Sequence, residues 1–253
     1  MPHSFQLEVL GIGNAYDGER TSASLLLEEN DFRLLLDCGP TVPAAIFHRN
    51  MDPDAIDAIY ITHTHPDHCL GLSCLLNWMD AKKRKRPLLL IAQAEQWPVL
   101  EPLLAFSHWP EPTLGFVIER QNSESLLAIG PWQIETSVTR HAVANLSLQL
   151  RTSWGHRLFY SGDGSLSHKG QQLAAQSNWV FLECETLSPH PSHGCWLDIQ
   201  KLTHKPGSQW RLYHIDPQYR PQLSALVRHI AHLDLAEEGQ QLVSEKSGVI
   251  DVA

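Results

Sequence analysis

The chain has 253 residues, 43 % of them hydrophobic, which is enough for a large core in one folded domain. Its formal net charge of −9 excludes attraction of nucleic acid through the overall field, although a local basic patch could override that field. The five cysteines include no Cys-x-x-Cys pair, so neither a zinc knuckle nor a disulfide framework is expected. We find no signal peptide and no apolar run of membrane-spanning length, so we expect a soluble protein of the reducing cytoplasm with no membrane partner.

In chain order, the hydrophobic pattern predicts strands first and then helices interleaved with further strands. The expected strands cover residues 5–10, 22–28, 32–37, 56–62, 88–91, 116–119, 125–128, 132–139, 146–151, 157–161, 179–184, 210–215 and part of 242–252. The expected helices cover residues 42–49, 71–80, 95–106, 169–177, a segment containing 199–202, and 220–233. No residue-level repeat or linker marks a boundary, so we expect a single domain over residues 1–253, with two sheets face to face and helices outside.

Four side chains of the metal-ligand type follow an apolar strand within six residues: His63, His65, Asp67 and His68. Imidazole and carboxylate together suit zinc, manganese or iron. Side chains repeat every second residue in an extended segment, so His63 and His65 point the same way and can chelate one ion. Pro66 then lets the chain turn, so that Asp67 and His68 can face a second ion. The motif alone therefore predicts two neighbouring metal positions.

Four positions do not fill two metal sites, so further ligands are expected at the ends of other strands. His141, Asp163 and His214 each come at the end of an apolar stretch, where a core strand meets an open loop. Taken alone, each of the three is more often an ordinary loop residue. Together with the motif they give seven candidate ligands, five histidines and two aspartates, for a dinuclear centre.

The order and spacing of these segments resemble the metallo-β-lactamase superfamily. Within it, the chain is most similar to the ribonuclease Z-like branch, which includes tRNA 3′-processing endonucleases and cyclic-phosphate phosphodiesterases of the phosphonate pathway. The resemblance covers nearly the whole chain, through residues 10–13, 24–27, 35–39, 61–68, 71–72, 141, 161–163, 181–186 and 213–215. It implies an α/β fold of the metallo-β-lactamase type, a four-layer αββα sandwich.

The resemblance also implies a role for each candidate ligand. His63, His65 and His141 would bind the first divalent ion, Asp67, His68 and His214 would bind the second, and Asp163 would bridge the two. Zinc is the expected metal, with manganese or iron as alternatives. Asp37 resembles the residue that orients a ligand histidine, because a carboxylate can accept the free imidazole N–H. The alternative for Asp37 is an aspartate in a turn at the end of a strand.

Ribonuclease Z-like enzymes also carry a histidine that is thought to protonate the leaving group, shortly after the strand that corresponds to residues 181–186. His193 is the better placed candidate because it precedes a helix-like segment, although Gly194 replaces the usual small hydroxyl residue after it. His190 is the alternative, and both could be loop residues. The resemblance therefore implies two catalytic residues: Asp67, which could orient the attacking water, and His193, which would donate a proton to the leaving group.

Paired ions can activate water for attack on phosphorus or on a carbonyl carbon. His193 and the branch resemblance favour a metal-dependent phosphodiesterase that acts on a small phosphodiester or an RNA 3′ end. The alternative is a thioesterase- or lactonase-type hydrolase of a carbonyl substrate, which the acidic charge and the lack of a long basic, glycine-rich tRNA-binding arm favour. A non-catalytic binding module is a third hypothesis, which the complete ligand set disfavours. A homodimer stays open, since related proteins often dimerise.

The only basic run of the chain is Lys82–Arg86. It could touch a phosphate backbone or an acidic partner. More often such a run is the solvated end of a helix, where positive charge suits the helix dipole.

Overall fold

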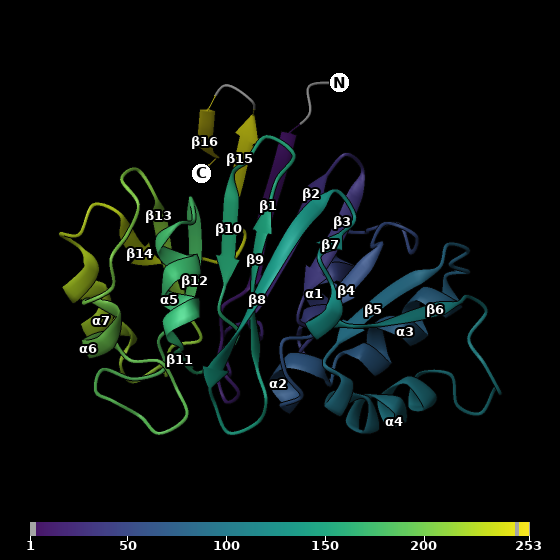
Figure 1. Cartoon of the computed structure of the whole chain (residues 1–253). Helices are drawn as coiled ribbons and strands as arrows, with labels where there is room; N and C mark the ends of the chain where they lie inside the picture. The colour runs from purple at the N-terminus through teal and green to yellow at the C-terminus, as the bar shows by residue number, and fades with distance from the viewer. Residues whose placement is uncertain (1–3, 246–247, 253) are drawn as a thin grey trace. The chain divides into compact units, whose positions relative to one another are not determined.

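The computed structural model describes residues 4–245 and 248–252 of a chain that divides into two compact units. Unit 1 comprises Met1–Gly11, Thr21–Leu126 and Glu238–Ala253, and unit 2 comprises Ile12–Arg20 and Leu127–Glu237. Each unit contains one mixed β-sheet and its own helices, so the predicted α/β class is confirmed (Figure 1). None of the helices in the described part of the chain is long and apolar enough to cross a membrane.

The sheet of unit 1 has the strand order β16-β15-β1-β2-β3-β4-β5-β6. Its strands are β1 (Ser4–Gly11), β2 (Ser24–Glu29), β3 (Phe32–Leu36), β4 (Ala58–Tyr60), β5 (Leu88–Ala92), β6 (Ile118–Asn122), β15 (Gln241–Glu245) and β16 (Gly248–Val252). Its helices are α1 (Val42–His48), α2 (Pro66–Cys69), α3 (Leu72–Ala81) and α4 (Trp97–Ser107), with short 3-10 turns η1 (Ala94–Gln96) and η2 (Ser123–Ser125).

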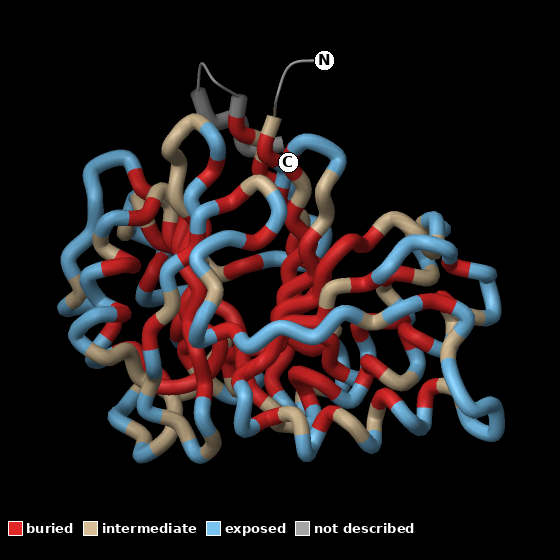
Figure 2. Tube along the Cα trace, turned by 45° about the vertical axis from the view of Figure 1, so that its right-hand side comes forward, coloured by how far each residue is buried: buried red, intermediate tan, exposed pale blue. Residues whose placement is uncertain are grey.

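The core of unit 1 joins the middle of its sheet to α1, α3 and α4. In α3, Leu72, Leu75, Leu76 and Met79 recur at helical spacing, and all four are fully buried. This apolar stripe confirms the helix that the sequence predicts there. Figure 2 shows the buried residues gathered along the strands, with the exposed ones mostly in loops and on outer helix surfaces.

The sheet of unit 2 has the strand order β11-β8-β9-β10-β12-β13-β14, with β7 also paired to β8. Its strands are β7 (Ala128–Ile129), β8 (Trp132–Arg140), β9 (Leu146–Arg151), β10 (Arg157–Tyr160), β11 (Ser165–Leu166), β12 (Trp179–Glu183), β13 (Gln209–Tyr213) and β14 (Leu233–Leu235). Its helices are α5 (His168–Ala175), α6 (Trp196–Ile199) and α7 (Arg220–Val227). A separate apolar core joins β10, β12 and β13 to these three helices.

Both units follow one topological plan. In unit 1 the antiparallel strands β1, β2 and β3 lead into the parallel pairings β3–β4, β4–β5 and β5–β6. In unit 2 the antiparallel strands β8, β9 and β10 lead into the parallel pairings β10–β12, β12–β13 and β13–β14. The carboxyl ends of parallel strands lie along one edge of their sheet, which is where α/β proteins commonly place functional side chains.

The helix expected to contain residues 199–202 covers Trp196–Ile199 instead. Two further predicted elements differ from the structure. The helix expected over residues 220–233 ends at Val227, because Leu233 pairs with Trp210 in a parallel ladder and so belongs to β14. The strand expected at 125–128 is displaced, since Ser123–Ser125 forms a 3-10 turn and β7 begins only at Ala128. In both places pairing with a neighbouring strand outweighs the local apolar pattern.

The basic run Lys82–Arg86 is not a continuous exposed surface. Arg84 is 1 % exposed, and its guanidinium donates hydrogen bonds to the carbonyl oxygens of Pro53, Arg86 and Pro87. The same guanidinium lies 5.4 Å from the centre of the Phe116 ring. Burial lowers the pKa of Arg84. The central cation of the run therefore stabilises unit 1 and is not presented to a phosphate backbone.

Candidate functional site

The histidine motif lies just beyond the carboxyl end of β4 in unit 1. His63 is fully buried, and its Nε2 atom lies 3.2 Å from Nδ1 of His65. Two nitrogens bound to one tetrahedral zinc ion at 2.0–2.1 Å would lie about 3.3 Å apart. The Thr62 hydroxyl donates to the Asp37 carboxylate, so its oxygen can accept from Nδ1 of His63 at 3.1 Å. The two imidazoles therefore present Nε2 and Nδ1 at the spacing of a chelating pair.

Asp37 holds the ring of His68 at the end of β3. Its buried carboxylate accepts hydrogen bonds from Nδ1 of His68 at 2.9 Å and from the backbone N–H of Thr62 at 2.8 Å. Because Nδ1 carries the proton, the lone pair of His68 is on Nε2, which lies 3.3 Å from Oδ2 of Asp67. Asp37 has a φ of +58°, a conformation that is costly for a residue with a side chain. The geometry fits an orienting carboxylate better than a simple turn residue.

Two glycines let the motif pack against the end of β3. The backbone N–H of Cys38 donates to the His68 carbonyl at 2.7 Å, and that of Gly71 donates to the Cys38 carbonyl at 2.9 Å. A Cβ atom at Gly39 would lie 1.9 Å from the Asp67 carbonyl oxygen, and one at Gly71 would lie 2.1 Å from the Gly39 carbonyl oxygen. Only glycine permits these backbone approaches, so Gly39 and Gly71 fix the position of α2 and its side chains.

In unit 2, Asp163 lies among the other predicted ligands. It follows β10, whereas His141 follows β8 and His214 follows β13. Oδ2 of Asp163 lies 3.4 Å from Nε2 of His214 and 3.9 Å from Nε2 of His141. The structure therefore brings the three predicted residues of this unit together, with the carboxylate facing both imidazole Nε2 atoms.

The two imidazoles of this cluster are oriented by oxygen acceptors in the same unit. Nδ1 of His141 donates to the backbone carbonyl of Ser192 at 2.6 Å, and Nδ1 of His214 donates to Oε2 of Glu185 at 2.9 Å. The other oxygen of Glu185 accepts from the Asn14 amide at 2.9 Å. Each ring therefore carries its proton on Nδ1 and its lone pair on Nε2, the arrangement of a metal-ligating histidine. The role of Glu185 is one that the sequence analysis did not identify.

A contact with the buried carboxylate of Glu183 holds the half-buried His193 beside the cluster of unit 2. Nδ1 of His193 is hydrogen-bonded to Oε1 of Glu183, whose other oxygen accepts from the backbone N–H of Gly164 at 2.6 Å and of Gly194 at 2.7 Å. Burial, and then the charge of Asp163, raise the pKa of Glu183 to about 7. Burial lowers the pKa of His193, but the hydrogen bond and charge of Glu183 outweigh it, so the pKa of His193 is raised. The hydrogen bond and charge of Glu183 therefore favour the protonated form of His193.

The neighbouring His190 has a different environment. Its Nδ1 atom accepts a hydrogen bond from the backbone N–H of Ser192 at 3.3 Å, and its ring centre lies 5.0 Å from that of His193. No described residue pairs His190 with a carboxylate. Of the two candidates for a proton donor, only His193 has the carboxylate partner that a general acid needs for orientation. Glu183, like Glu185, was not singled out from the sequence.

The donor set of each unit suits a divalent transition metal. Unit 1 offers imidazole nitrogens and one carboxylate within the motif, and unit 2 offers the same two chemistries around Asp163. Four rings direct Nδ1 toward an oxygen, namely those of His63, His68, His141 and His214. This combination of borderline nitrogen and hard oxygen donors is typical of zinc, manganese and iron sites.

Comparison with known proteins agrees with this chemistry. The family model described as "Anti-Pycsar protein Apyc1" matches residues 5–242. A relative of that name from Bacillus phage BSP38 is 37 % identical over 201 residues, which is 73 % of this chain and 78 % of the relative. With other relatives of the same name the alignment covers only about two fifths of their length, as with that of Saccharibacillus brassicae, at 41 %.

Solved structures share the fold at low sequence identity. The metallo-β-lactamase fold protein YhfI from Bacillus subtilis superposes with a TM-score of 0.77 at 17 % identity, over 95 % of this chain and 100 % of that one. A diphosphatase from the PhnP family superposes with a TM-score of 0.72 at 19 % identity, over 97 % of this chain and 99 % of that one. The short form of human tRNase Z superposes with a TM-score of 0.71 at 17 % identity, over 93 % of this chain and 98 % of that one. The predicted metallo-β-lactamase fold is thereby confirmed. The predicted resemblance to ribonuclease Z is found in sequence, where the enzyme from Lachnospira eligens is 32 % identical over 49 % of this chain and 40 % of that one.

Proposed function

Because the chain belongs to the Anti-Pycsar protein Apyc1 family, within the metallo-β-lactamase fold, we propose that it is a dinuclear metal-dependent phosphodiesterase of small phosphodiesters. The hydrolase names of similar proteins, a ribonuclease Z and a PhnP-family diphosphatase among them, support phosphorus chemistry. The choice of a small substrate is supported by the net charge of −9 and by the buried position of Arg84 within the only basic run. An RNA 3′ end is the second candidate substrate.

The proposed ligand assignment follows the pattern of the superfamily. His63, His65 and His141 would hold one ion, Asp67, His68 and His214 would hold the other, and Asp163 would be shared between them. The observations that support it are separate for each unit: chelate-like spacings of 3.2 and 3.3 Å within the motif, and of 3.4 Å between Asp163 and His214. Zinc is the proposed metal, because its sites commonly combine imidazole with carboxylate.

When bound, such a pair of ions supplies Lewis-acid activation of water and of the phosphoryl oxygens. Side chains of the protein orient the water and donate the proton. Asp67 can accept a hydrogen bond from the attacking water and orient it. His193 can donate its Nε2 proton to the departing alkoxide, because Glu183 holds the ring through Nδ1.

The pairing of His193 with buried Glu183 is the observation that carries the proposal. An alkoxide is a poor leaving group, so its departure from phosphorus benefits from a positioned proton donor. A thioester releases a thiolate, which needs less assistance. A carbonyl hydrolase would therefore gain less from a buried carboxylate that holds a protonated imidazole, although a thioesterase or lactonase remains the alternative.

Substrate panels test the reaction class. Metal-loaded protein would be assayed on bis-p-nitrophenyl phosphate, 2′,3′- and 3′,5′-cyclic nucleotides and an RNA with a 3′ trailer, beside thioesters and lactones. We expect hydrolysis of phosphodiesters, with small substrates preferred over RNA. Activity on carbonyl substrates alone would refute the proposal. Metal analysis giving less than one ion per chain in an unchelated sample would refute the dinuclear assignment.

A matched pair of variants tests the proton donor. His193→Ala should slow phosphodiesters with alkoxide leaving groups about 10²–10⁴-fold, the usual contribution of general acid catalysis. The same substitution should slow the hydrolysis of bis-p-nitrophenyl phosphate much less, because p-nitrophenolate leaves without needing a proton. The control is His190→Ala, three residues away, which should change neither rate appreciably. Equal losses on both leaving groups in His193→Ala would remove the assigned role.

A further inference from the structure

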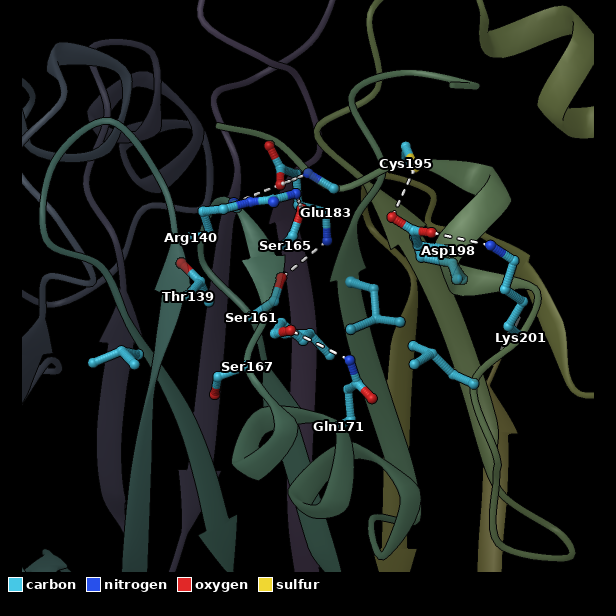
Figure 3. A pocket seen from close by; sticks show the side chains of 17 residues that line it. Thr139, Arg140, Ser161, Ser165, Ser167, Gln171, Glu183, Cys195, Asp198 and Lys201 are labelled. Carbon is cyan, nitrogen blue, oxygen red and sulfur yellow. Dashed lines mark hydrogen bonds and ion pairs between the residues drawn. The ribbon is translucent and has the colours of Figure 1, made fainter. Parts of the chain in front are cut away.

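Unit 2 contains a cavity of about 630 Å³ whose lining includes none of the candidate metal ligands. It lies beside the end of β8, the segment from β11 into α5, and the stretch from α6 to Leu202 (Figure 3). This volume is within the range of about 300–1,000 Å³ that is usual for small-molecule sites. The cavity is therefore large enough for an organic molecule of one or two rings.

One part of the lining is apolar. Leu182 of β12 and Ile199 of α6 are buried, and Leu166 and Leu202 are half-buried beside them. Such side chains favour an apolar ligand body, because its contact removes their remaining surface from water.

The charged side chains of the cavity lining differ in whether a group of opposite charge pairs with them. Asp198 is paired with Lys201 at 3.2 Å. Glu183 is engaged by His193 and by two backbone N–H groups. Arg140, in contrast, donates one hydrogen bond, to the Ser165 hydroxyl at 3.3 Å, and forms no ion pair with any residue that the structure describes. The cavity therefore carries one cation whose charge the surrounding side chains leave unbalanced.

Arg140 is exposed at the strand end, and Figure 3 shows its side chain lying close to Ser165 and Glu183 at the cavity. The planar guanidinium is suited to bidentate contact with a carboxylate, phosphate or sulfonate group. The Ser165 hydroxyl, which accepts from the Arg140 guanidinium at 3.3 Å, adds a neutral group beside the cation. Arg140 and Ser165 therefore form a polar contact at the cavity, in addition to its apolar lining.

We propose that this cavity binds a small organic anion, whose acidic group pairs with Arg140 and whose apolar body packs against Leu182 and Ile199. The bound molecule would also contact Gly194 and Glu183, the segment that holds His193. The site is distinct from the proposed metal ligands, and its test does not depend on any catalytic activity.

Calorimetric titration of metal-loaded protein with naphthalene-2-sulfonate tests the proposal. We expect one site per chain, and weaker binding of the neutral analogue naphthalene-2-sulfonamide. Arg140→Gln should weaken sulfonate binding at least tenfold and leave sulfonamide binding unchanged, since a charge-assisted contact is lost. Arg228→Gln, at an exposed arginine of the same unit outside the cavity, is the charge-matched control and should bind as the wild type.

Two further experiments locate the bound anion and identify its acidic group. Leu202→Trp should weaken both naphthalene probes by filling the apolar side of the cavity. Tighter binding of 2-naphthyl phosphate than of naphthalene-2-carboxylate would assign a phosphate ligand, and the reverse order a carboxylate. Unchanged sulfonate binding in Arg140→Gln would overturn the proposal. So would binding that disappears when the metal is chelated, because the anion would then lie at the metal ligands.

Discussion

Asp37→Asn should weaken metal binding by unit 1 while leaving every direct ligand in place. The carboxylate accepts from His68 Nδ1, from the Thr62 hydroxyl and from the Thr62 backbone N–H, with no exposed surface. An asparagine would have to point its NH₂ group at one of these donors. Leaving a buried donor unsatisfied costs about 1–3 kcal/mol. Loss of an orienting carboxylate typically lowers metal affinity about 10–100-fold, which corresponds to about 1.4–2.7 kcal/mol.

The assay is competition for zinc against a chromophoric chelator, with unfolding of the chelated protein measured in parallel. The control is Asp57→Asn, which also removes a buried carboxylate of unit 1, one that accepts from the Arg33 backbone and pairs with Arg86 at 2.5 Å. Both variants should lower stability, but only Asp37→Asn should lower zinc affinity. Equal zinc affinity in the two variants would show that Asp37 is a structural aspartate.

Three other outcomes are expected. Glu183→Gln should slow hydrolysis of substrates with alkoxide leaving groups about 10–100-fold, more than hydrolysis of p-nitrophenyl substrates, because His193 loses the carboxylate charge that favours its protonated form. Equal losses would contradict this. Arg84→Met should destabilise the protein by about 3 kcal/mol in denaturant titration, since three carbonyl groups lose a charged donor, whereas exposed Lys82→Met should cost almost nothing. Burial, and then a neighbouring imidazole, lower the pKa of His232. The unfolded chain therefore binds the proton more tightly, and stability falls as the pH drops below about 6.5. His232→Gln should reduce the difference in melting temperature between pH 7 and pH 5, and an unchanged difference would contradict the shift.

The sequence predicted those elements whose pattern is local. The helical spacing of α3 and the hairpin of β2 and β3 are visible in the chain itself, and both are confirmed. The end of α7 is not visible in this way. Residues 228–233 continue an apolar pattern, but Leu233 is in a strand because β13 offers a parallel partner. Only tertiary pairing distinguishes the two outcomes.

The sequence analysis did not identify Glu183 and Glu185, again because the local pattern does not distinguish them. All five residues of β12 are buried, so the strand shows no alternation that would set its final glutamate apart. Their signal was nevertheless present, since both acidic residues come at the end of an apolar run, as Asp37 and Asp163 do. The seven proposed ligands and the single domain over residues 1–253 remain predictions for metal binding and unfolding experiments to decide.

The repeated topological plan explains why polar residues at strand ends carry the chemistry of both units. A parallel strand is buried on both faces and can expose a polar side chain only where it leaves its sheet. Asp37 and the histidine motif follow β3 and β4, whereas Asp163, Glu185 and His214 follow β10, β12 and β13. Four of the five candidate imidazoles are then oriented by an oxygen of their own unit, so these donor atoms are arranged before any metal arrives. Within each unit, the positions of the proposed ligands therefore follow from topology even though no residue-level repeat exists in the sequence.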